Sequence, residues 1–366
     1  MYKNIFLLAV FSFLSSCVIF TTERYLIKSD LSTANRYKEG INSKELYEYL
    51  SVLASDEFEG RETTYPGQKK AANFLKKTLL KWNIGPPLDD SGYFQVFEVE
   101  IKDFSNVTLI INEDTLEFIN DFYSFGNPYN TVENNLKTID AGYGIVNKNY
   151  NSYEGLNIKD RVVIIKEGFP NEKDFSIKEG NWRNKVEVAT NKGALAVIFK
   201  KKNYANTDLM LKEQLLYPRM KMHYNVKTKQ QIPVFFVSED ALNRYNKKSI
   251  SFSTNVNEIK TAENVLGFIP GKKDEIIVIS AHYDHIGYDM GEICNGADDD
   301  ASGTSSLLSI ANAFQRAYND GYKPNRGILF LMVSGEEKGL FGSKYYTENP
   351  YFPLENTIAN LNIDMI

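Results

Sequence analysis

Three apolar runs in the second half of the chain each lead directly into a cluster of histidine or acidic residues. The runs at 276–280, 328–333 and 358–363 have the length and composition of buried β-strands. Ligands of an open α/β sheet bind beyond the carboxyl ends of its strands. The pattern therefore predicts an α/β fold in which these polar residues form one site. The three clusters that follow these runs are AHYDH at 281–285, SGEEKG at 334–339 and NIDM at 362–365. A fourth cluster, GADDDASG at 296–303, lies between the first two.

The composition is that of a globular protein without a nucleic-acid surface. The length of 366 residues favours two domains over one. A content of 43% hydrophobic and 24% charged residues is typical of a protein with a sizeable core. The formal net charge of −5 argues against nucleic-acid binding, because neutralising phosphates needs clustered lysine and arginine. We expect no nucleic-acid partner.

The N-terminus predicts export and a membrane anchor. An apolar run of ten residues follows Lys3, which is too short to span a bilayer but fits a secretory signal. It continues into Leu-Ser-Ser-Cys at 14–17, which resembles the lipobox of bacterial lipoproteins. We expect residues 1–16 to be a lipoprotein signal peptide, Cys17 to carry the lipid, and residues 17–40 to form a polar tether. The alternative is an ordinary signal peptide with an incidental cysteine.

This interpretation places the protein in the cell envelope, attached to a membrane on its periplasmic or cell-surface side. The only other thiol is Cys294, just before the GADDDASG cluster. We expect it to be a small residue packed near the site, with a soft metal ligand or a redox switch as alternatives.

Two helices and a strand are predicted before residue 103. Apolar residues recur at helical spacing in 44–58 and in 68–82, where lysines occupy the other face. Residues 93–101 alternate between apolar and polar, as in a strand. After about Thr261 the α/β pattern resumes, and a further helix is predicted at 305–318.

Between these parts the composition changes to short apolar strands separated by Asn, Lys and Asp turns. One helix is predicted here, at 182–193, and the lone His223 is not expected to bind metal. We therefore predict one domain made of residues 41–103 and 259–366, with residues 104–258 inserted as a separate β-rich module.

The residue types in the clusters fit a hydrolytic zinc site. Such sites use histidine nitrogen and carboxylate oxygen ligands, and paired zinc ions share a bridging carboxylate. Asp284 lies two residues beyond His282 and should point to the same side, where it can accept the imidazole N–H. His285 should point the opposite way. Of the adjacent Glu336 and Glu337, one can bind metal while the other accepts a proton from water.

The set resembles the co-catalytic zinc aminopeptidase family, which also includes glutaminyl cyclases and the transferrin-receptor ectodomain. The resemblance implies a three-layer zinc exopeptidase domain with a mixed sheet and two zinc ions. It implies that Asp299 bridges the zinc ions, and that His282 and Asp364 bind the first. It further implies that Glu337 binds the second and that Glu336 is the general base.

The resemblance covers nearly the whole chain after residue 40. Residues 53–75 look like the opening helix-loop-helix of bacterial members. The insert, with GYGI, RVVIIKEG, NKGALAVIFK and IPVFFVS, looks like a protease-associated domain. Each short motif is weak alone, whereas four in the family's order, each behind its expected strand, are specific. The alternative is a set of ordinary acidic turns in an unrelated Rossmann-like fold.

The sequence departs from the family at one point. The family has a further histidine ligand well downstream of the N-x-D-M motif, and the sequence stops at Ile366. We expect a piece of a longer protein. An inactive copy, or a one-metal variant completed by another chain, are the alternatives.

The expected function is that of a zinc-dependent aminopeptidase acting on peptides outside the cytoplasm. The alternative is a non-catalytic binding protein on the same fold that uses the insert for partner contact. A glutaminyl cyclase is a third possibility, less favoured by GADDDASG and the insert. The residue preference and the oligomeric state are left open.

Overall fold

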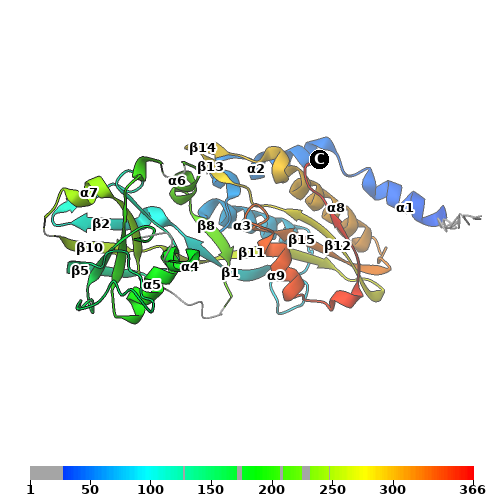
Figure 1. Cartoon of the computed structure of the whole chain (residues 1–366). Coiled ribbons are helices and arrows are strands. Elements are labelled where there is room, and N and C mark those ends of the chain that lie inside the picture. Colours follow the sequence, from blue (N-terminus) through cyan, green and yellow to red (C-terminus); the bar gives the residue numbers. More distant parts are fainter. Residues whose placement is uncertain (1–27, 127, 171–174, 207–208, 225–230, 247) are drawn as a thin grey trace, which may run out of the picture.

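The computed structural model describes residues 28–126, 128–170, 175–206, 209–224, 231–246 and 248–366. The molecule is elongated, with a sheet in each of two lobes (Figure 1). The first lobe holds a six-stranded sheet in the order β16-β12-β15-β11-β1-β8. Its strands are β1 (Phe94–Lys102), β8 (Arg219–Met222), β11 (Asn257–Ile269), β12 (Lys273–His282), β15 (Arg326–Val333) and β16 (Thr357–Asn362).

The six-stranded sheet is mixed. β12 runs parallel to both β15 and β16, whereas β11 is antiparallel to β15 and to β1. The apolar runs that predicted buried strands form β12, β15 and β16. β16 lies at the edge of the sheet and is largely exposed, so the expected burial is wrong for this strand. The carboxyl ends of the three strands lie at the same edge, where the polar side chains beyond them can meet.

Helices cover both faces of this sheet. On one face α2 (Ser43–Leu53), α3 (Pro66–Lys81) and α8 (Gly303–Asn319) share a core with β11, β12 and β15. On the other face, α9 (Phe341–Glu348) packs Tyr346 against a second cluster. The expected three-layer α/β fold with a mixed sheet is confirmed.

Local sequence explains the longest of these helices. Pro66 opens α3, where its missing N–H costs nothing, and Ala71, Leu75 and Leu79 form its buried stripe. In α8, Leu307 and Leu308 are fully buried. The helix predicted at 44–58 is shorter than expected. It ends at Leu53, and the turn η1 (Asp56–Arg61) comes next.

The second lobe is an eight-stranded sheet with its own hydrophobic core, in the order β3-β2-β10-β5-β6-β7-β9-β4. Its strands are β2 (Val107–Ile111), β3 (Asp114–Thr115), β4 (Phe122–Ser124), β5 (Thr131–Asp140), β6 (Val162–Lys166), β7 (Ala196–Lys201), β9 (Val234–Ser238) and β10 (Ser249–Thr254). Its helices are α4 (Ile177–Gly180), α5 (Trp182–Asn191), α6 (Leu209–Leu216) and α7 (Glu239–Asn243).

One strand from within residues 104–258 leaves this lobe. β8 pairs antiparallel with β1, placing Met222 opposite Val99, and so forms the edge of the six-stranded sheet. The domain boundaries proposed from the sequence remain a prediction. The sequence did not predict that a strand from within residues 104–258 would pair in the six-stranded sheet.

Only part of the predicted N-terminal signal and tether lies within the described residues. Residues 1–27 lie outside the described part of the chain, and with them the signal peptide and Cys17. Within the expected tether, α1 (Lys28–Lys38) is helical, and the Tyr37 hydroxyl donates to the Asp320 carboxylate at the end of α8. Among the described residues, no helix has both the length and the apolar character needed to cross a bilayer.

Candidate metal centre

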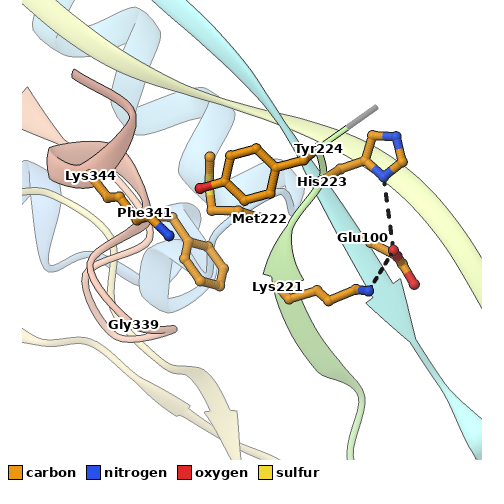
Figure 2. Close-up of a pocket in the computed structure, with 8 residues that line it drawn as sticks. All are labelled: Glu100, Lys221, Met222, His223, Tyr224, Gly339, Phe341 and Lys344. Carbon is orange, nitrogen blue, oxygen red and sulfur yellow. Dashed lines mark ion pairs between the residues drawn. The ribbon is translucent and has the colours of Figure 1, made fainter. Parts of the chain in front are cut away.

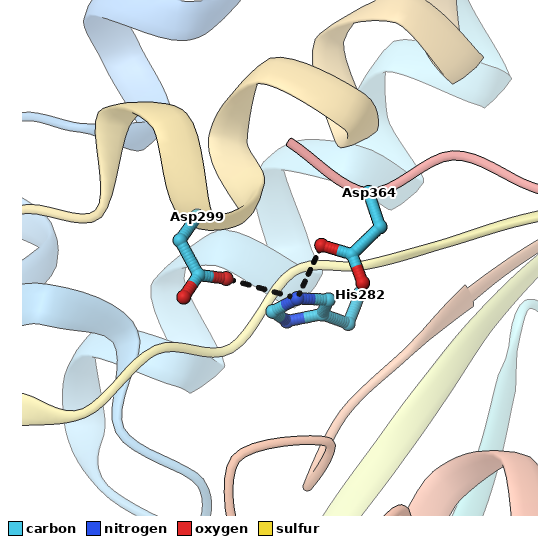
Figure 3. A group of neighbouring side chains, drawn as sticks. All are labelled: His282, Asp299 and Asp364. Carbon is cyan, nitrogen blue, oxygen red and sulfur yellow. Dashed lines mark ion pairs between the residues drawn. The ribbon is translucent and has the colours of Figure 1, made fainter. Parts of the chain in front are cut away.

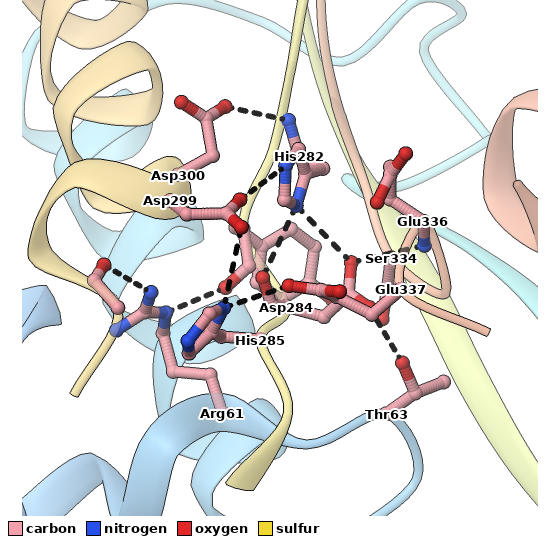
Figure 4. Close-up of polar contacts among 12 residues, drawn as sticks. Arg61, Thr63, His282, Asp284, His285, Asp299, Asp300, Ser334, Glu336 and Glu337 are labelled. Carbon is pink, nitrogen blue, oxygen red and sulfur yellow. Dashed lines mark hydrogen bonds and ion pairs between the residues drawn. The ribbon is translucent and has the colours of Figure 1, made fainter. Parts of the chain in front are cut away.

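Strand register brings the four clusters together. His282 is the last residue of β12, and its partner in β15 is Val333, so the loop carrying Glu336 and Glu337 begins beside it. Asp364 lies just beyond β16, which pairs with the same β12. The fourth cluster forms the turn η4 (Ala297–Ser302), which leads into α8 and brings Asp299 alongside (Figure 4).

Asp299 lies between two imidazole rings. Its Oδ1 is 3.1 Å from His282 Nε2, and its Oδ2 is 3.9 Å from His285 Nδ1. On the first side, Asp364 Oδ1 lies 3.7 Å from His282 Nε2 (Figure 3). On the second, Glu337 Oε1 lies 2.7 Å from His285 Nδ1. These contacts form two triads that share Asp299. The first triad is His282, Asp299 and Asp364, and the second is His285, Asp299 and Glu337. Within each triad the donor atoms lie within 4.8 Å of one another.

The position of His285 corrects the expectation that it points away from His282. Alternation of side chains holds only along a strand. β12 ends at His282, and the chain then leaves the sheet. His285 makes a separate β-bridge with Glu62, and its N–H donates to the Arg61 carbonyl at 3.3 Å.

Asp284 is buried and contributes in a way the sequence did not predict. His282 Nδ1 lies 3.2 Å from the backbone carbonyl of Asp284, and 3.8 Å from its carboxylate. The carboxylate instead accepts from the Thr63 hydroxyl at 2.8 Å and from the Glu336 N–H at 3.2 Å. Burial raises the pKa of the Asp284 carboxyl, which the nearby His282 and these donors oppose. Asp284 therefore positions the Glu336 loop as well as His282.

Asp300, for which the sequence predicted no role, ties three segments together. Its carboxylate accepts the N–H of His282 at 3.2 Å, of Gly303 at 3.0 Å and of Met365 at 3.2 Å. Burial raises the pKa of this carboxyl to about 6. The end of β12, the start of α8 and the segment carrying Asp364 thus share one buried acceptor.

Arg61 was also missed. It is fully buried, and its guanidinium donates to the carbonyls of Leu53, Tyr283, Asn295 and Gly296. Burial lowers its pKa to about 10, so it stays protonated at neutral pH. Arg61 is the last residue of η1, and nothing in the sequence around it distinguished it from an exposed arginine.

The two glutamates differ in their surroundings. Burial raises the pKa of Glu336, and the carboxylates of Asp284, Glu337 and Asp364 act in the same direction. The hydrogen bond with His285 lowers the pKa of Glu337. Glu336 also lines a cavity of about 310 Å³ together with His282, Asp364 and apolar side chains that include Leu331 and Val333.

The donor set suits zinc. Imidazole nitrogens and carboxylate oxygens are the ligands of hydrolytic zinc sites. Three carboxylates belong to the two triads and Glu336 lies beside them, and a divalent cation would offset their mutual repulsion. Cys294, in the two-stranded ribbon of β13 (Gly287–Asp289) and β14 (Glu292–Cys294), belongs to neither triad.

A separate cavity of about 450 Å³ opens where β8 faces the start of α9 (Figure 2). Glu100 on its wall pairs with Lys221 at 3.0 Å and lies 3.9 Å from His223. His223 belongs to neither triad.

Comparison with known proteins shows a family match over the part of the chain that carries the triads. Residues 264–366 match the model of Peptidase family M28. A vacuolar membrane protease of Verticillium alfalfae is 39% identical over 87 residues, which are 23% of this chain and 8% of that protein. Aminopeptidase YwaD of Bacillus subtilis is 28% identical over 142 residues, 37% of this chain and 29% of that protein.

Among solved structures, a zinc aminopeptidase from Bacillus subtilis, BSAP, aligns with a TM-score of 0.42 at 21% identity. The alignment covers 88% of this chain and 69% of that one. The chain matches less than a third of the length of either curated relative.

Proposed function

We propose that the protein is a zinc-dependent aminopeptidase that removes N-terminal residues from peptides. The proposal is supported by the match of residues 264–366, which carry the candidate metal centre, to the model of Peptidase family M28. One observation carries the proposal. The two oxygens of Asp299 face different imidazoles, which is the arrangement expected of a carboxylate shared by two metal ions.

We assign the metal-binding roles by position. His282, Asp299 and Asp364 would hold one zinc ion, and Asp299 with Glu337 would contribute to the other. Zinc, when bound, polarises a carbonyl and acidifies water.

Glu336 is assigned as the general base. It lies beside the triads without belonging to either, and burial raises its pKa, which strengthens it as a proton acceptor. It would take a proton from the attacking water and deliver it to the departing amine as the peptide bond breaks. Asp284 holds the backbone of Glu336 in place through the N–H at 3.2 Å.

The test is hydrolysis of aminoacyl p-nitroanilides by the purified full chain, measured for the wild type and for Glu336→Gln. Loss of a general base costs about 10²- to 10⁴-fold in rate, and we expect kcat to fall in that range. Glu355→Gln changes an exposed glutamate outside both triads and serves as the matched control. A Glu336→Gln protein that keeps its zinc and full activity would refute the assignment. A protein that binds no zinc would favour the binding-protein alternative.

We also propose that the protein acts outside the cytoplasm, held by a lipid on Cys17. The support is the apolar run and Leu-Ser-Ser-Cys at residues 14–17. Incorporation of a labelled fatty acid, compared between the wild type and Cys17→Ala, tests it. Equal labelling of the two would rule out the lipid anchor without bearing on the peptidase site.

A further inference from the structure

We propose that the outer edge of β8 binds the leaving part of an extended peptide substrate through main-chain hydrogen bonds. The inference rests on the proposed function and adds the substrate class, which is peptides of several residues rather than dipeptides. It gives a role to the cavity between β8 and the start of α9, which the candidate metal centre does not use.

The strand register places β8 on the metal-centre side of the sheet's carboxyl edge. Phe94 of β1 lies opposite Val265 of β11, whose partner Met332 is near the carboxyl end of β15. β1 continues past this level, and β8 pairs with it only from Val99 onward. Val99 is five residues beyond Phe94, which is about 17 Å along a strand. β8 therefore lies beyond the same edge of the sheet as the metal centre.

The cavity connects β8 with the loop that carries the two glutamates. Its walls include Met222 of β8 on one side, and Gly339 and Phe341 at the start of α9 on the other (Figure 2). Gly339 comes two residues after Glu337, so this wall begins within about 7 Å of Glu337 along the chain. A peptide whose N-terminal residue lies at the metal centre can therefore continue into the cavity.

β8 presents backbone hydrogen-bonding groups at its outer edge. It is the last strand of its sheet, so among the described residues no further strand pairs with it on that side. The His223 N–H donates to the carbonyl of Glu98 in β1 at 2.9 Å. Antiparallel residues alternate in hydrogen bonding, so Lys221 also faces β1, whereas the N–H and C=O groups of Met220 and Met222 point outward. An extended peptide can add to such an edge as a further strand.

The competing interpretation is that β8 is only a protected edge. It is four residues long and carries Arg219 and Lys221, and short basic edge strands resist pairing with other chains. Protection of this kind acts against self-association and gives no preference for longer substrates. The two interpretations therefore differ in how hydrolysis depends on peptide length.

The first experiment measures kcat/KM of the purified full chain for leucine followed by one to five alanines. We expect kcat/KM to rise with length, by about 2- to 10-fold for each main-chain hydrogen bond gained. N-methylation of single amides other than the scissile one should lower kcat/KM at alternate positions, because alternate residues of an extended peptide face β8. Cleavage of the whole series without a gain in length, or without this alternation, overturns the inference and leaves the proposed function standing.

The second experiment changes the edge itself. Met220→Pro removes one outward N–H and keeps the ladder to β1, since proline is tolerated where the N–H of an edge strand faces outward. We expect the ratio of kcat/KM for the longest peptide to that for the shortest to fall by about 2- to 10-fold. Met220→Ala loses the same side chain, retains the N–H and should keep the wild-type ratio. A wild-type ratio in Met220→Pro would contradict the pairing.

Hydrogen exchange identifies the occupant of the edge. In Glu336→Gln, added longest peptide should slow the exchange of the Met220 and Met222 N–H groups. Slow exchange that depends on protein concentration without peptide would show that β8 pairs with a second copy of this chain, and would overturn the inference. If the wild type cleaves no peptide of the series, the inference fails together with the proposed function.

Discussion

A single buried guanidinium organises the backbone around the candidate metal centre. Arg61 lies beneath the site and donates to four carbonyls, two of them in the loop that precedes Asp299. The carboxylates of Asp284 and Asp300 favour its charged form and oppose the effect of its burial. A buried charge is costly unless it is hydrogen-bonded, and the four carbonyls that accept from Arg61 reduce that cost.

We predict that Arg61→Met lowers the free energy of unfolding by at least about 3 kcal/mol. Each buried carbonyl left without a donor costs about 1–3 kcal/mol, and several are left at once. Arg61→Lys should recover little, because an ammonium cannot reproduce the planar fork. Urea unfolding measures the change, with Arg36→Met at an exposed ion pair as the control. A loss below about 0.5 kcal/mol, which is normal for a surface change, would contradict the assigned role.

At the level of elements, the site depends on three parallel strands and on the edge strand β8. β12, β15 and β16 bring His282, the Glu336 loop and Asp364 to one edge. β8 closes the other side of the sheet, where Met222 is buried in a cluster with Val99 and Phe341. Phe341 comes directly after the glutamate loop, so β8 supports the packing of that loop.

We predict that Met222→Asp releases β8 from β1. A charge without a partner in this cluster is costly, and a four-residue edge strand has few hydrogen bonds to resist it. Hydrogen exchange should accelerate in β8 while the β12–β15 ladder keeps its protection. Arg219→Gln, a change at an exposed position of the same strand whose guanidinium contacts Gln214, should leave the exchange of β8 unaltered. Unchanged protection of β8 in Met222→Asp would show that Met222 does not hold the strand.

At the scale of the whole molecule, the two lobes have separate hydrophobic clusters and are joined by few elements. One core belongs to the eight-stranded sheet, and the others line the two faces and the edge of the six-stranded sheet. β1 and β11 lead into and out of the second lobe, and β8 crosses back (Figure 1). The two lobes therefore have separate sources of stability.

We predict that Phe235→Ala destabilises the eight-stranded lobe by about 3–5 kcal/mol, the usual cost of a phenylalanine-sized cavity, and leaves zinc content unchanged. Phe235 is fully buried in that core. Leu307→Ala, in the core beside the metal centre, should instead weaken zinc binding. Hydrogen exchange mapped along the chain separates the two effects. Equal opening of both lobes in Phe235→Ala would show that they unfold as one unit.

Much of the fold, and the meeting of His282 with Asp364, could be predicted because both depend on local patterns. Apolar runs of strand length predict β12, β15 and β16, and parallel pairing brings the polar residues at their carboxyl ends together. The direction of the His285 side chain could not be predicted, because the alternation of side chains along a strand was assumed to continue beyond His282, where β12 ends. Arg61 and Asp300 gave no signal, since a loop charge and a third aspartate in a row read as ordinary surface. The assigned roles of the site residues remain predictions.

The sequence by itself determined which polar residues follow each strand and which kinds of donor atoms those residues carry. Those are properties of neighbouring residues, and hydrophobic periodicity reports them directly. Only the tertiary structure decided that Asp299 stands between two imidazoles, that Arg61 lies beneath them and that β8 joins a sheet begun more than a hundred residues earlier. These contacts join segments far apart in the chain, and no local pattern encodes which distant backbone a side chain will meet.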